Sequence, residues 1–354
     1  MSKQETVLVT GGSGYIGSWC IIGLLQQGYT VRTTVRSLAR EAAVRAAIGT
    51  MVDPQDRLSF HAADLTSDAG WNDAAAGCDY LLHVASPISI SPPKNPDELI
   101  VPARDGTMRA VGAALRAGVK RVVLTSSVAA ASPRTSSLRA GSLAGTRESA
   151  TDETVWTDLD DPAVNAYARS KTLAERAAWD LIEATAGATP GATTLATVNP
   201  SVVLGPVLGR DFSDSVQVVQ RLLSGRVPGL PRLGFSFVDV RDVADLHIRA
   251  MTAPEAAGQR FIAAGDFAWM AEVAAILKTG LGEGARKVPT RRVPNVVLRL
   301  VALFDKTVAG VTPRLGEKRT FISAKAQNLL GWRPRPLEET VLDCARSLIA
   351  SRAV

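Results

Sequence analysis

The segment Thr10–Gly17, TGGSGYIG, limits the possible folds of this chain more than any other stretch of its sequence. It follows a short apolar run and leads into residues with helical spacing. A helix N-terminus has unpaired backbone N–H groups and a partial positive charge, so it binds a pyrophosphate when no side chains stand in the way. A strand, a glycine-rich turn and a helix at the start of the chain therefore predict a dinucleotide-binding βαβ unit.

The three spaced glycines of this turn have separate expected roles. Gly11 allows a tight turn, Gly14 lets the phosphates approach the backbone, and Gly17 lets the helix lie close to the sheet. Their GxxGxxG spacing differs from the commoner GxGxxG fingerprint. No lysine follows as it does in a P-loop, so a nucleoside triphosphate is disfavoured as the ligand.

Strand-like and helix-like segments alternate through the first 200 residues. Short β-branched or apolar runs occupy 6–10, 29–35, 58–64, 79–86, 121–127 and 194–200, and helical spacing occupies 14–28, 38–49, 67–77 and 99–118. Strands separated by helices form a parallel sheet with helices on both faces. We therefore predict an α/β fold, a Rossmann-type doubly wound parallel sheet with a smaller C-terminal substrate-binding lobe.

Domain boundaries are expected where this alternation stops. We assign residues 1–198 to the nucleotide-binding domain, with 236–265 returning to it, and 199–235 and 266–354 to the substrate-binding lobe. Residues 132–153 are rich in Ser, Arg, Gly and Ala and have no apolar period, so we expect an exposed loop there.

A helix with one apolar face is expected within residues 291–310. Its apolar face would consist of Val297, Leu300, Val301 and Phe304. A helix that lies on a membrane surface has a similar pattern. We expect this face to pack on the substrate-binding lobe instead.

The composition is that of a globular protein that binds small molecules. The chain has 354 residues and a formal net charge of +6, but its lysines and arginines are scattered, which disfavours a nucleic-acid partner. Its three cysteines and three histidines show no metal-ligand spacing. No apolar run reaches the ~18 residues of a membrane span, and no signal-peptide pattern is present. We therefore expect a cytoplasmic protein without a metal, membrane or nucleic-acid partner.

The end of the second strand-like segment indicates which dinucleotide is bound. An Asp or Glu there commonly holds the adenine ribose of NAD, but this strand ends in Arg36, with Arg32 inside it. A cation at that place suits the 2′-phosphate of NADP(H), so we predict NADP(H) as the cofactor. Arg40 and Arg45, on the following helix, are weaker candidates for the same phosphate.

Two further strand ends are expected to border the cofactor, because ligands of a parallel sheet bind at the carboxyl ends of its strands. Asp64 and Leu65 end the third strand, where an adenine edge would lie. The segment HVASP ends the fourth strand, near the nicotinamide ribose and the pyrophosphate. The candidates in that segment are Val84, Ala85 and Ser86.

The segment YARSK contains the residues best suited to acid–base chemistry. Tyr167 and Lys171 are four residues apart, so both side chains lie on one face of a helix. A phenol has a pKa near 10 and is a poor catalyst at neutral pH, but a nearby ammonium lowers this pKa. Tyr167 is then able to donate a proton to a carbonyl oxygen as hydride reaches the carbon.

A hydroxyl at the end of the fifth strand-like segment is expected beside the nicotinamide. Ser127 would hydrogen-bond the substrate carbonyl and stabilise negative charge on its oxygen. Ser126 is its rival, because neighbouring strand residues point to opposite faces. The sequence leaves the choice between the two serines open.

Taken together, these segments resemble the extended short-chain dehydrogenase/reductase family. The matching pieces occur in family order: TGGSGYIG, Asp64–Leu65, HVASP, TSS, YARSK, NPSVVLGP (199–206) and FVDVRDVA (237–244), with LGWRPRPLEET (330–340) near the end. Within the family, the chain looks most like the dihydroflavonol reductases and cinnamoyl-CoA reductases. The resemblance implies an NADP(H)-linked carbonyl reductase with the catalytic triad Ser127, Tyr167 and Lys171, in which the lysine also holds the nicotinamide ribose.

The resemblance also places Pro200 and Val202, with Asn199, along the nicotinamide. The full set of expected cofactor residues is Gly11, Ser13, Gly14, Tyr15, Ile16, Gly17, Arg36, Arg40, Asp64, Leu65, Val84, Ala85, Ser86, Tyr167, Lys171, Pro200 and Val202. Residues 128–145 lack the polar pattern of the flavonoid-recognising segment in the plant reductases, so a flavonoid substrate is not implied.

Three functions stay open at this point. We favour an NADPH-dependent reductase of an aldehyde or ketone, acting as a monomer or homodimer on a small-molecule carbonyl or alcohol. A nucleotide-sugar epimerase or dehydratase uses the same triad but retains bound NAD, which Arg36 disfavours. A non-catalytic NADP-binding regulator has the same fold, but it has no need of the pair Tyr167 and Lys171.

Overall fold

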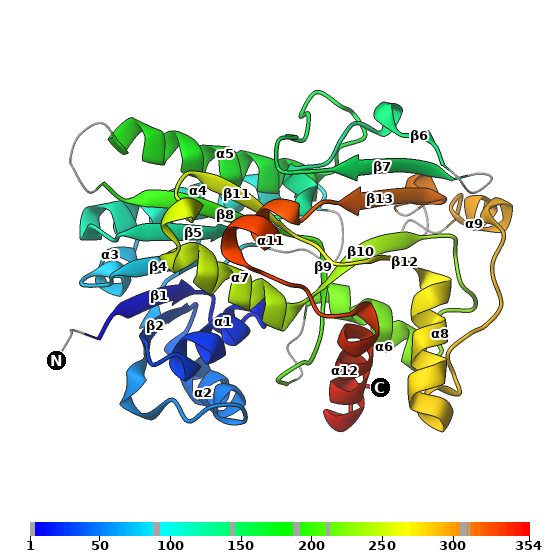
Figure 1. Ribbon diagram of the computed structural model, residues 1–354, viewed down its shortest axis with the longest axis horizontal. Helices are drawn as coiled ribbons and strands as arrows, with labels where there is room; N and C mark the ends of the chain where they lie inside the picture. The colour runs from blue at the N-terminus through cyan, green and yellow to red at the C-terminus, as the bar shows by residue number, and fades with distance from the viewer. Residues whose placement is uncertain are drawn as a thin grey trace.

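The computed structural model describes residues 4–87, 93–141, 146–186, 192–209, 213–304, 310 and 312–354. Its centre is a seven-stranded sheet (Figure 1). The strands are β1 (Thr6–Thr10), β2 (Thr30–Val35), β3 (Leu58–Ala62), β4 (Tyr80–His83), β5 (Arg121–Thr125), β8 (Thr194–Pro200) and β11 (Gln259–Ala263). All are parallel, in the order β11-β8-β5-β4-β1-β2-β3. This confirms the predicted Rossmann-type doubly wound sheet.

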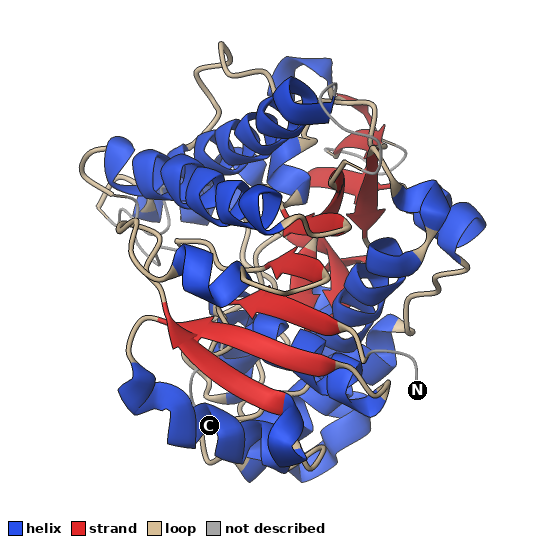
Figure 2. Cartoon of the chain, turned by 90° about the vertical axis from the view of Figure 1, so that its left-hand side faces the viewer, coloured by secondary structure: helices blue, strands red, loops and turns tan. Residues whose placement is uncertain are grey.

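Helices cover both faces of this sheet (Figure 2). One layer contains α1 (Tyr15–Gln26), α2 (Glu41–Gly49) and α7 (Val240–Thr252), and the other contains α3 (Trp71–Ala75), α4 (Asp97–Ala117) and α5 (Ala166–Ala186). Strand β1 contributes side chains to the apolar cores on both faces of the sheet. Val7 and Val9 are buried in the core on the α1 side, and Leu8 is buried in the core on the α4 side. An apolar strand buried on both faces is typical of a parallel sheet.

Two smaller sheets lie beyond the main one. In the first, β9 (Val202–Leu204) runs parallel to β10 (Gly234–Asp239), which pairs antiparallel with β12 (Phe267–Trp269). The second contains β6 (Arg139–Ala140), β7 (Arg147–Thr151) and β13 (Glu317–Phe321). The expected exposed loop at 132–153 is therefore wrong in part, because β7 pairs along its whole length with β13 and Glu153 is buried.

The remaining helices belong to the second half of the chain. They are α6 (Gln217–Leu223), α8 (Met270–Leu281), α9 (Asn295–Val301), α11 (Ala324–Leu330) and α12 (Leu337–Ala350). Short 3₁₀ turns occupy Leu38–Arg40, Gln55–Arg57, Val128–Ala130, Thr135–Ser137, Asp214–Val216, Pro254–Ala256, Gly282–Ala285 and Thr312–Arg314. Residues 236–265 supply β11 to the main sheet and α7 to one of its helix layers, but they also contain most of β10, which belongs to a smaller sheet. The domain boundaries themselves stay a prediction.

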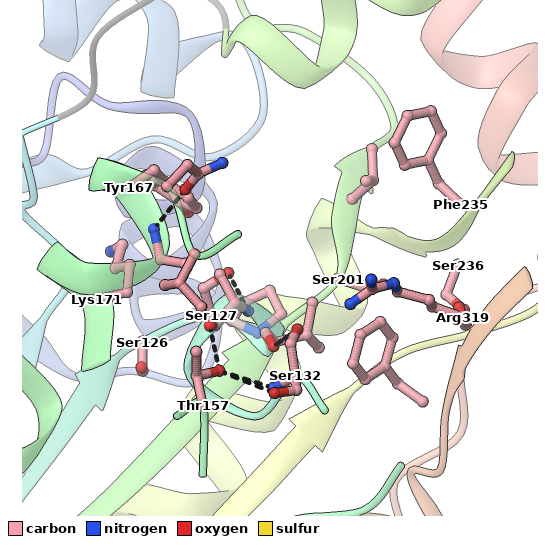
Figure 3. A pocket seen from close by; sticks show the side chains of 18 of the residues that line it. Ser126, Ser127, Ser132, Thr157, Tyr167, Lys171, Ser201, Phe235, Ser236 and Arg319 are labelled. Atoms are coloured by element: carbon pink, nitrogen blue, oxygen red, sulfur yellow. Dashed lines mark hydrogen bonds between the residues drawn. The ribbon is translucent and has the colours of Figure 1, made fainter. Parts of the chain in front are cut away.

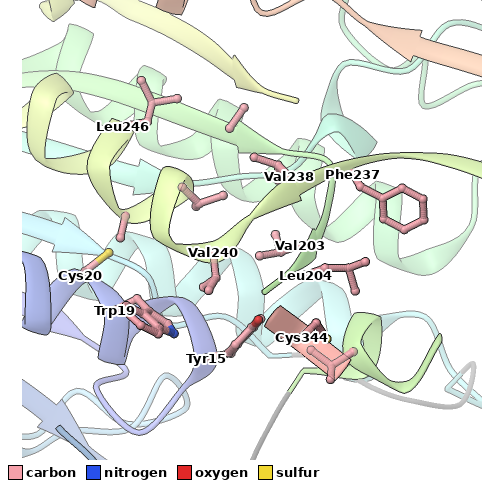
Figure 4. Close-up of a cluster of buried hydrophobic side chains, with 14 of the residues drawn as sticks. Tyr15, Trp19, Cys20, Val203, Leu204, Phe237, Val238, Val240, Leu246 and Cys344 are labelled. Carbon is pink, nitrogen blue, oxygen red and sulfur yellow. The ribbon is translucent and has the colours of Figure 1, made fainter. Parts of the chain in front are cut away.

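One apolar core extends from α1 into the C-terminal half of the chain (Figure 4). Tyr15 and Trp19 of α1 belong to the same cluster as Cys344 of α12. The Tyr15 hydroxyl donates a hydrogen bond to the carbonyl oxygen of Gly205 at 2.7 Å, and Nε1 of Trp19 donates to that of Pro206 at 3.1 Å. The helix that follows the glycine turn is therefore fixed to the segment that follows β9.

Helix α9 differs from the helix expected at 291–310. It is shorter, and Leu298 is the residue that packs against the core. The face expected to pack is exposed instead, and Phe304 just after the helix is 91% exposed. Residues 305–309 of the expected helix lie outside the described part of the chain. Within that described part, no helix combines the length and the apolar character that crossing a bilayer requires.

Candidate active site

The strand order of the main sheet reverses between β1 and β4, and ligands of such sheets bind outside the carboxyl ends of the strands at this point. Thr10 ends β1, and its hydroxyl oxygen accepts hydrogen bonds from the backbone N–H groups of Val84 and Ala85, both at 3.0 Å. The same hydroxyl lies 2.8 Å from Nδ1 of His83. These bonds fasten the segment after β4 to the start of the glycine turn.

Close contacts explain the glycines of the turn. Gly11 has a φ of 72°, and a Cβ there would come within 3.0 Å of Cα of Ala85. A Cβ at Gly17 would overlap the carbonyl oxygen of Gly11, so its close approach is to the turn rather than to the sheet. Gly12, which the sequence analysis did not single out, leaves room for the side chain of Thr33. The turn thus has the bare backbone that a pyrophosphate needs.

Arg36 and Asp64 lie near each other at the ends of β2 and β3. The hydroxyl and the backbone N–H of Thr66 both donate to the Asp64 carboxylate, at 2.7 and 2.8 Å. These bonds lower the pKa of Asp64, and the positive charge of Arg36 adds to the lowering. Arg36 and Arg40 are both exposed at this edge of the sheet.

Other candidates near this edge have structural contacts. Arg32 donates to three carbonyl oxygens at the end of α3. Arg45 pairs with Glu41 at 2.8 Å on the same helix. Leu65 packs against Gly106 of α4, where a Cβ would overlap the leucine side chain. The charge of Arg36 acts on Asp64, just after β3, whereas the charge of Arg32 acts on His61 within that strand.

A cavity of about 610 Å³ lies at the carboxyl ends of β5 and β8. The expected site residues that line it are Tyr15, Ile16, Val84, Ser86, Ser127, Tyr167, Lys171, Pro200 and Val202. Those that lie outside it are Gly11, Ser13, Gly14, Gly17, Arg36, Arg40, Asp64, Leu65 and Ala85, which belong to the glycine turn and to the ends of β2, β3 and β4. The three expected catalytic residues therefore share one cavity.

Tyr167 and Lys171 project from α5 into this cavity (Figure 3). Although Tyr167 is 37% exposed, desolvation of its phenol raises the pKa, and an interaction with the Ser127 side chain offsets part of this rise. The predicted lowering of this pKa by Lys171 is not seen in the chain alone. Lys171 itself is buried, which lowers its pKa to about 8 against the opposing negative charge of Glu175.

The two serines after β5 point to different surroundings (Figure 3). The Ser126 hydroxyl donates a hydrogen bond to Oε2 of Glu175 in the protein interior. The Ser127 side chain interacts with the Tyr167 phenol and accepts a hydrogen bond from the N–H of Ala129 at 3.1 Å. Both serines line the cavity, but the hydroxyl of Ser126 is already bonded to Glu175.

A buried polar network behind the cavity was not found from the sequence. Its centre is Glu175, whose carboxylate accepts hydrogen bonds from Thr197 at 3.0 Å, Asn199 at 2.9 Å and Arg260 at 2.7 Å. Asn199, expected along the nicotinamide, turns inward to this carboxylate. Glu175 is the last residue of the segment KTLAE, but its partner Arg260 lies on β11, far along the chain, so the sequence alone does not show the pair.

The far part of the cavity is lined by β10 and β13 and by the turn before β13. Arg319 donates to Glu317 at 2.9 Å, and the guanidinium of Arg314 lies 5.1 Å from the centre of the Phe235 ring. These residues line the cavity together with Ser236. In the described ranges, no group of three or more His, Cys, Asp or Glu residues is arranged to hold a metal ion.

Comparisons with known proteins show the family of this chain. The model of the NAD dependent epimerase/dehydratase family matches residues 7–264. Cinnamoyl-CoA reductase 2 of Medicago truncatula is 34% identical over 260 residues, covering 72% of this chain and 71% of the relative. Dihydroflavonol 4-reductase of Zea mays is 33% identical over 265 residues, covering 73% of this chain and 70% of the relative.

A solved structure extends the similarity to nearly the whole chain. The yeast methylglyoxal/isovaleraldehyde reductase Gre2, complexed with NADPH, superimposes with a TM-score of 0.78 at 25% identity. The alignment covers 98% of this chain and 99% of the yeast protein.

Proposed function

We propose that this chain, which belongs to the NAD dependent epimerase/dehydratase family, is an NADPH-dependent reductase of an aldehyde or ketone. The observation that carries the proposal is the meeting of Ser127, Tyr167 and Lys171 in one cavity at the carboxyl ends of the sheet. The reductases among its relatives and structural neighbours support the same reaction class.

The chain offers a site that fits NADP(H). The bare turn around Gly11 and Gly17 suits the pyrophosphate, and Arg36 suits the 2′-phosphate, since no acidic side chain ends β2. Val84 and Ser86 line the cavity next to this turn, and Pro200 lines it from β8. When bound, NADPH supplies the hydride that reduces the carbonyl carbon.

The chain's own residues supply the proton and hold the carbonyl oxygen. Tyr167 donates its phenolic proton to this oxygen as negative charge develops there. Ser127 hydrogen-bonds the same oxygen and stabilises that charge. The Lys171 ammonium stabilises the phenolate that Tyr167 becomes, and in the related reductases that the sequence resembles this lysine also holds the nicotinamide ribose.

The experiment that tests this function follows the absorbance of NADPH and NADH in parallel with a panel of carbonyl compounds. The panel contains aliphatic aldehydes, α-ketoesters, aryl ketones, a flavanonol and a cinnamoyl-CoA thioester. We expect oxidation of NADPH well above that of NADH with at least one of these classes. Tight NADPH binding without oxidation by any of them would instead favour the epimerase or the regulator.

A further inference from the structure

The carboxylate of Glu175 is fully buried and is held by side chains from three strands or their ends. Ser126 donates to it from the end of β5, Thr197 and Asn199 donate from β8, and Arg260 donates from β11. A buried carboxylate is stable only when it is paired and hydrogen-bonded in this way. The acid is therefore a fixed point behind the cavity.

Glu175 is connected to two of the proposed catalytic residues, Lys171 and Ser127. Glu175 lies one helical turn after Lys171 on α5, so the two side chains share a helix face. Glu175 also holds the chain around Ser127. Its carboxylate accepts from Ser126, the residue before Ser127. Nδ2 of Asn199 donates both to Glu175, at 2.9 Å, and to the carbonyl oxygen of Ser127, at 3.1 Å.

The charges around Lys171 leave Glu175 as its anionic neighbour. From β4, His83 faces the lysine, and burial with the lysine charge lowers the histidine pKa to about 3, so it is neutral. From α7, His247 bonds the Thr125 hydroxyl at 2.7 Å and is also neutral, since burial lowers its pKa to about 4. In the described chain, the negative charge that acts on Lys171 is that of Glu175.

We propose that Glu175 is a positioning residue of the reductase site: it orients the strand end that carries Ser127 and supplies the negative charge that keeps the Lys171 ammonium charged in a buried place. Arg260 in turn holds the carboxylate at 2.7 Å and lies 3.8 Å from the centre of the Trp156 ring. This role rests on the proposed function, but its effect on Lys171 is also measurable without turnover.

The test is the pH dependence of two properties in the full chain, reductase rate and NADPH affinity by fluorescence titration. Loss of the negative charge in Glu175→Gln is expected to move the alkaline fall of both to lower pH by about one unit or more. Glu175→Asp keeps the negative charge, so its rate and its NADPH affinity are expected to fall at the same alkaline pH as in wild type. A wild-type limb in Glu175→Gln, whatever its rate, would overturn the proposal.

The matched control is Glu153→Gln. Glu153 is also a buried acid near Arg260, but its carboxylate accepts from the N–H of Ile262 at 2.9 Å, and the negative charge that acts on Lys171 is that of Glu175. We expect no movement of the alkaline limb in this variant, and an equal movement would also overturn the proposal.

A second variant covers the case in which Glu175→Gln does not fold because Arg260 is left unpaired. Glu175→Gln combined with Arg260→Gln removes both buried charges together, and we expect the same direction of movement. If wild type binds NADPH but reduces nothing, the reductase proposal fails, whereas the binding profiles still decide the role of Glu175.

Discussion

Burial of the Tyr167 phenol raises its pKa, and the side chain of Ser127 offsets part of that rise. Ser126, the next residue back, is bonded to Glu175 instead. The two adjacent hydroxyls therefore have different surroundings, so we expect substitution of one serine to affect catalysis and substitution of the other to affect stability.

Ser127→Ala is expected to lower kcat of the reductase about 100-fold, because one hydrogen bond to the developing oxyanion is lost. NADPH affinity should stay close to that of wild type. Ser126→Ala should instead reduce the free energy of unfolding by about 1 kcal/mol, because the buried Glu175 carboxylate loses a donor. Steady-state kinetics and chemical denaturation distinguish the two, and the reverse pattern would identify Ser126 as the catalytic hydroxyl.

Tyr167→Phe removes the proposed proton donor and leaves the ring in place. We expect kcat to fall about 100-fold or more, with NADPH still bound, because general acid catalysis contributes on that scale. Single-turnover oxidation of bound NADPH measures the chemical step directly. Turnover at the wild-type rate would exclude this tyrosine as the acid.

The pH dependence of reduction should follow Lys171. Burial lowers its pKa from 10.5 to about 8, so the ammonium is present below that pH and is lost as the pH rises through it. We therefore expect the rate of reduction to be level near pH 7 and to fall above about pH 8. A rate profile between pH 6 and 10 checks this. A flat profile up to pH 10 would mean that the lysine charge does not support the step.

The preference for NADPH should depend on Arg36. Arg36→Ala is expected to raise the Kd for NADPH about tenfold or more, with little effect on NADH, because a charge-assisted contact to the 2′-phosphate is lost. Arg45→Ala is the matched control, since Arg45 is paired with Glu41 and is expected to leave the ratio of the two affinities unchanged. An unchanged ratio in Arg36→Ala would place the 2′-phosphate elsewhere.

The glycine turn gives a steric prediction. In Gly17→Ala the new Cβ overlaps the carbonyl oxygen of Gly11, so the turn must move, and we expect NADPH affinity to fall about tenfold or more. Gly49→Ala, at the end of α2, adds a Cβ with no atom within 4 Å and should bind NADPH as wild type does. Fluorescence titration compares both variants, and equal affinities would show that the turn tolerates a side chain.

Six of the seven strands of the main sheet could be predicted from the sequence because their signals are local: each is a short β-branched or apolar run, and helical periods lie between them. The seventh strand, β11, was not expected, although its segment was assigned to the same domain. The carboxyl ends of those strands then indicate where the cofactor and the catalytic residues meet. Tyr167 and Lys171 could be found because their four-residue spacing on a helix is itself local.

Features that depend on distant partners could not be predicted. Strand β7 reads RESAT, with no apolar alternation, and it is a strand because it pairs with β13 and β6. Glu175 reads as one more polar residue of a helix until Arg260 of β11 is placed against it. The exposed face of α9 was assigned to the interior because periodicity shows that a face is apolar, not which element covers it.

The continuous core between α1 and α12 also determines how this protein can come apart. Trp332, Val341 and Leu348, beyond the region matched by the family model, are fully buried in the same cluster as the first helix. Cutting the chain after the nucleotide-binding half would expose that surface to water and remove packing from the glycine turn. The two halves should therefore melt together in a single transition, and the amide protons of α1 and α12 should exchange with solvent in the same cooperative opening.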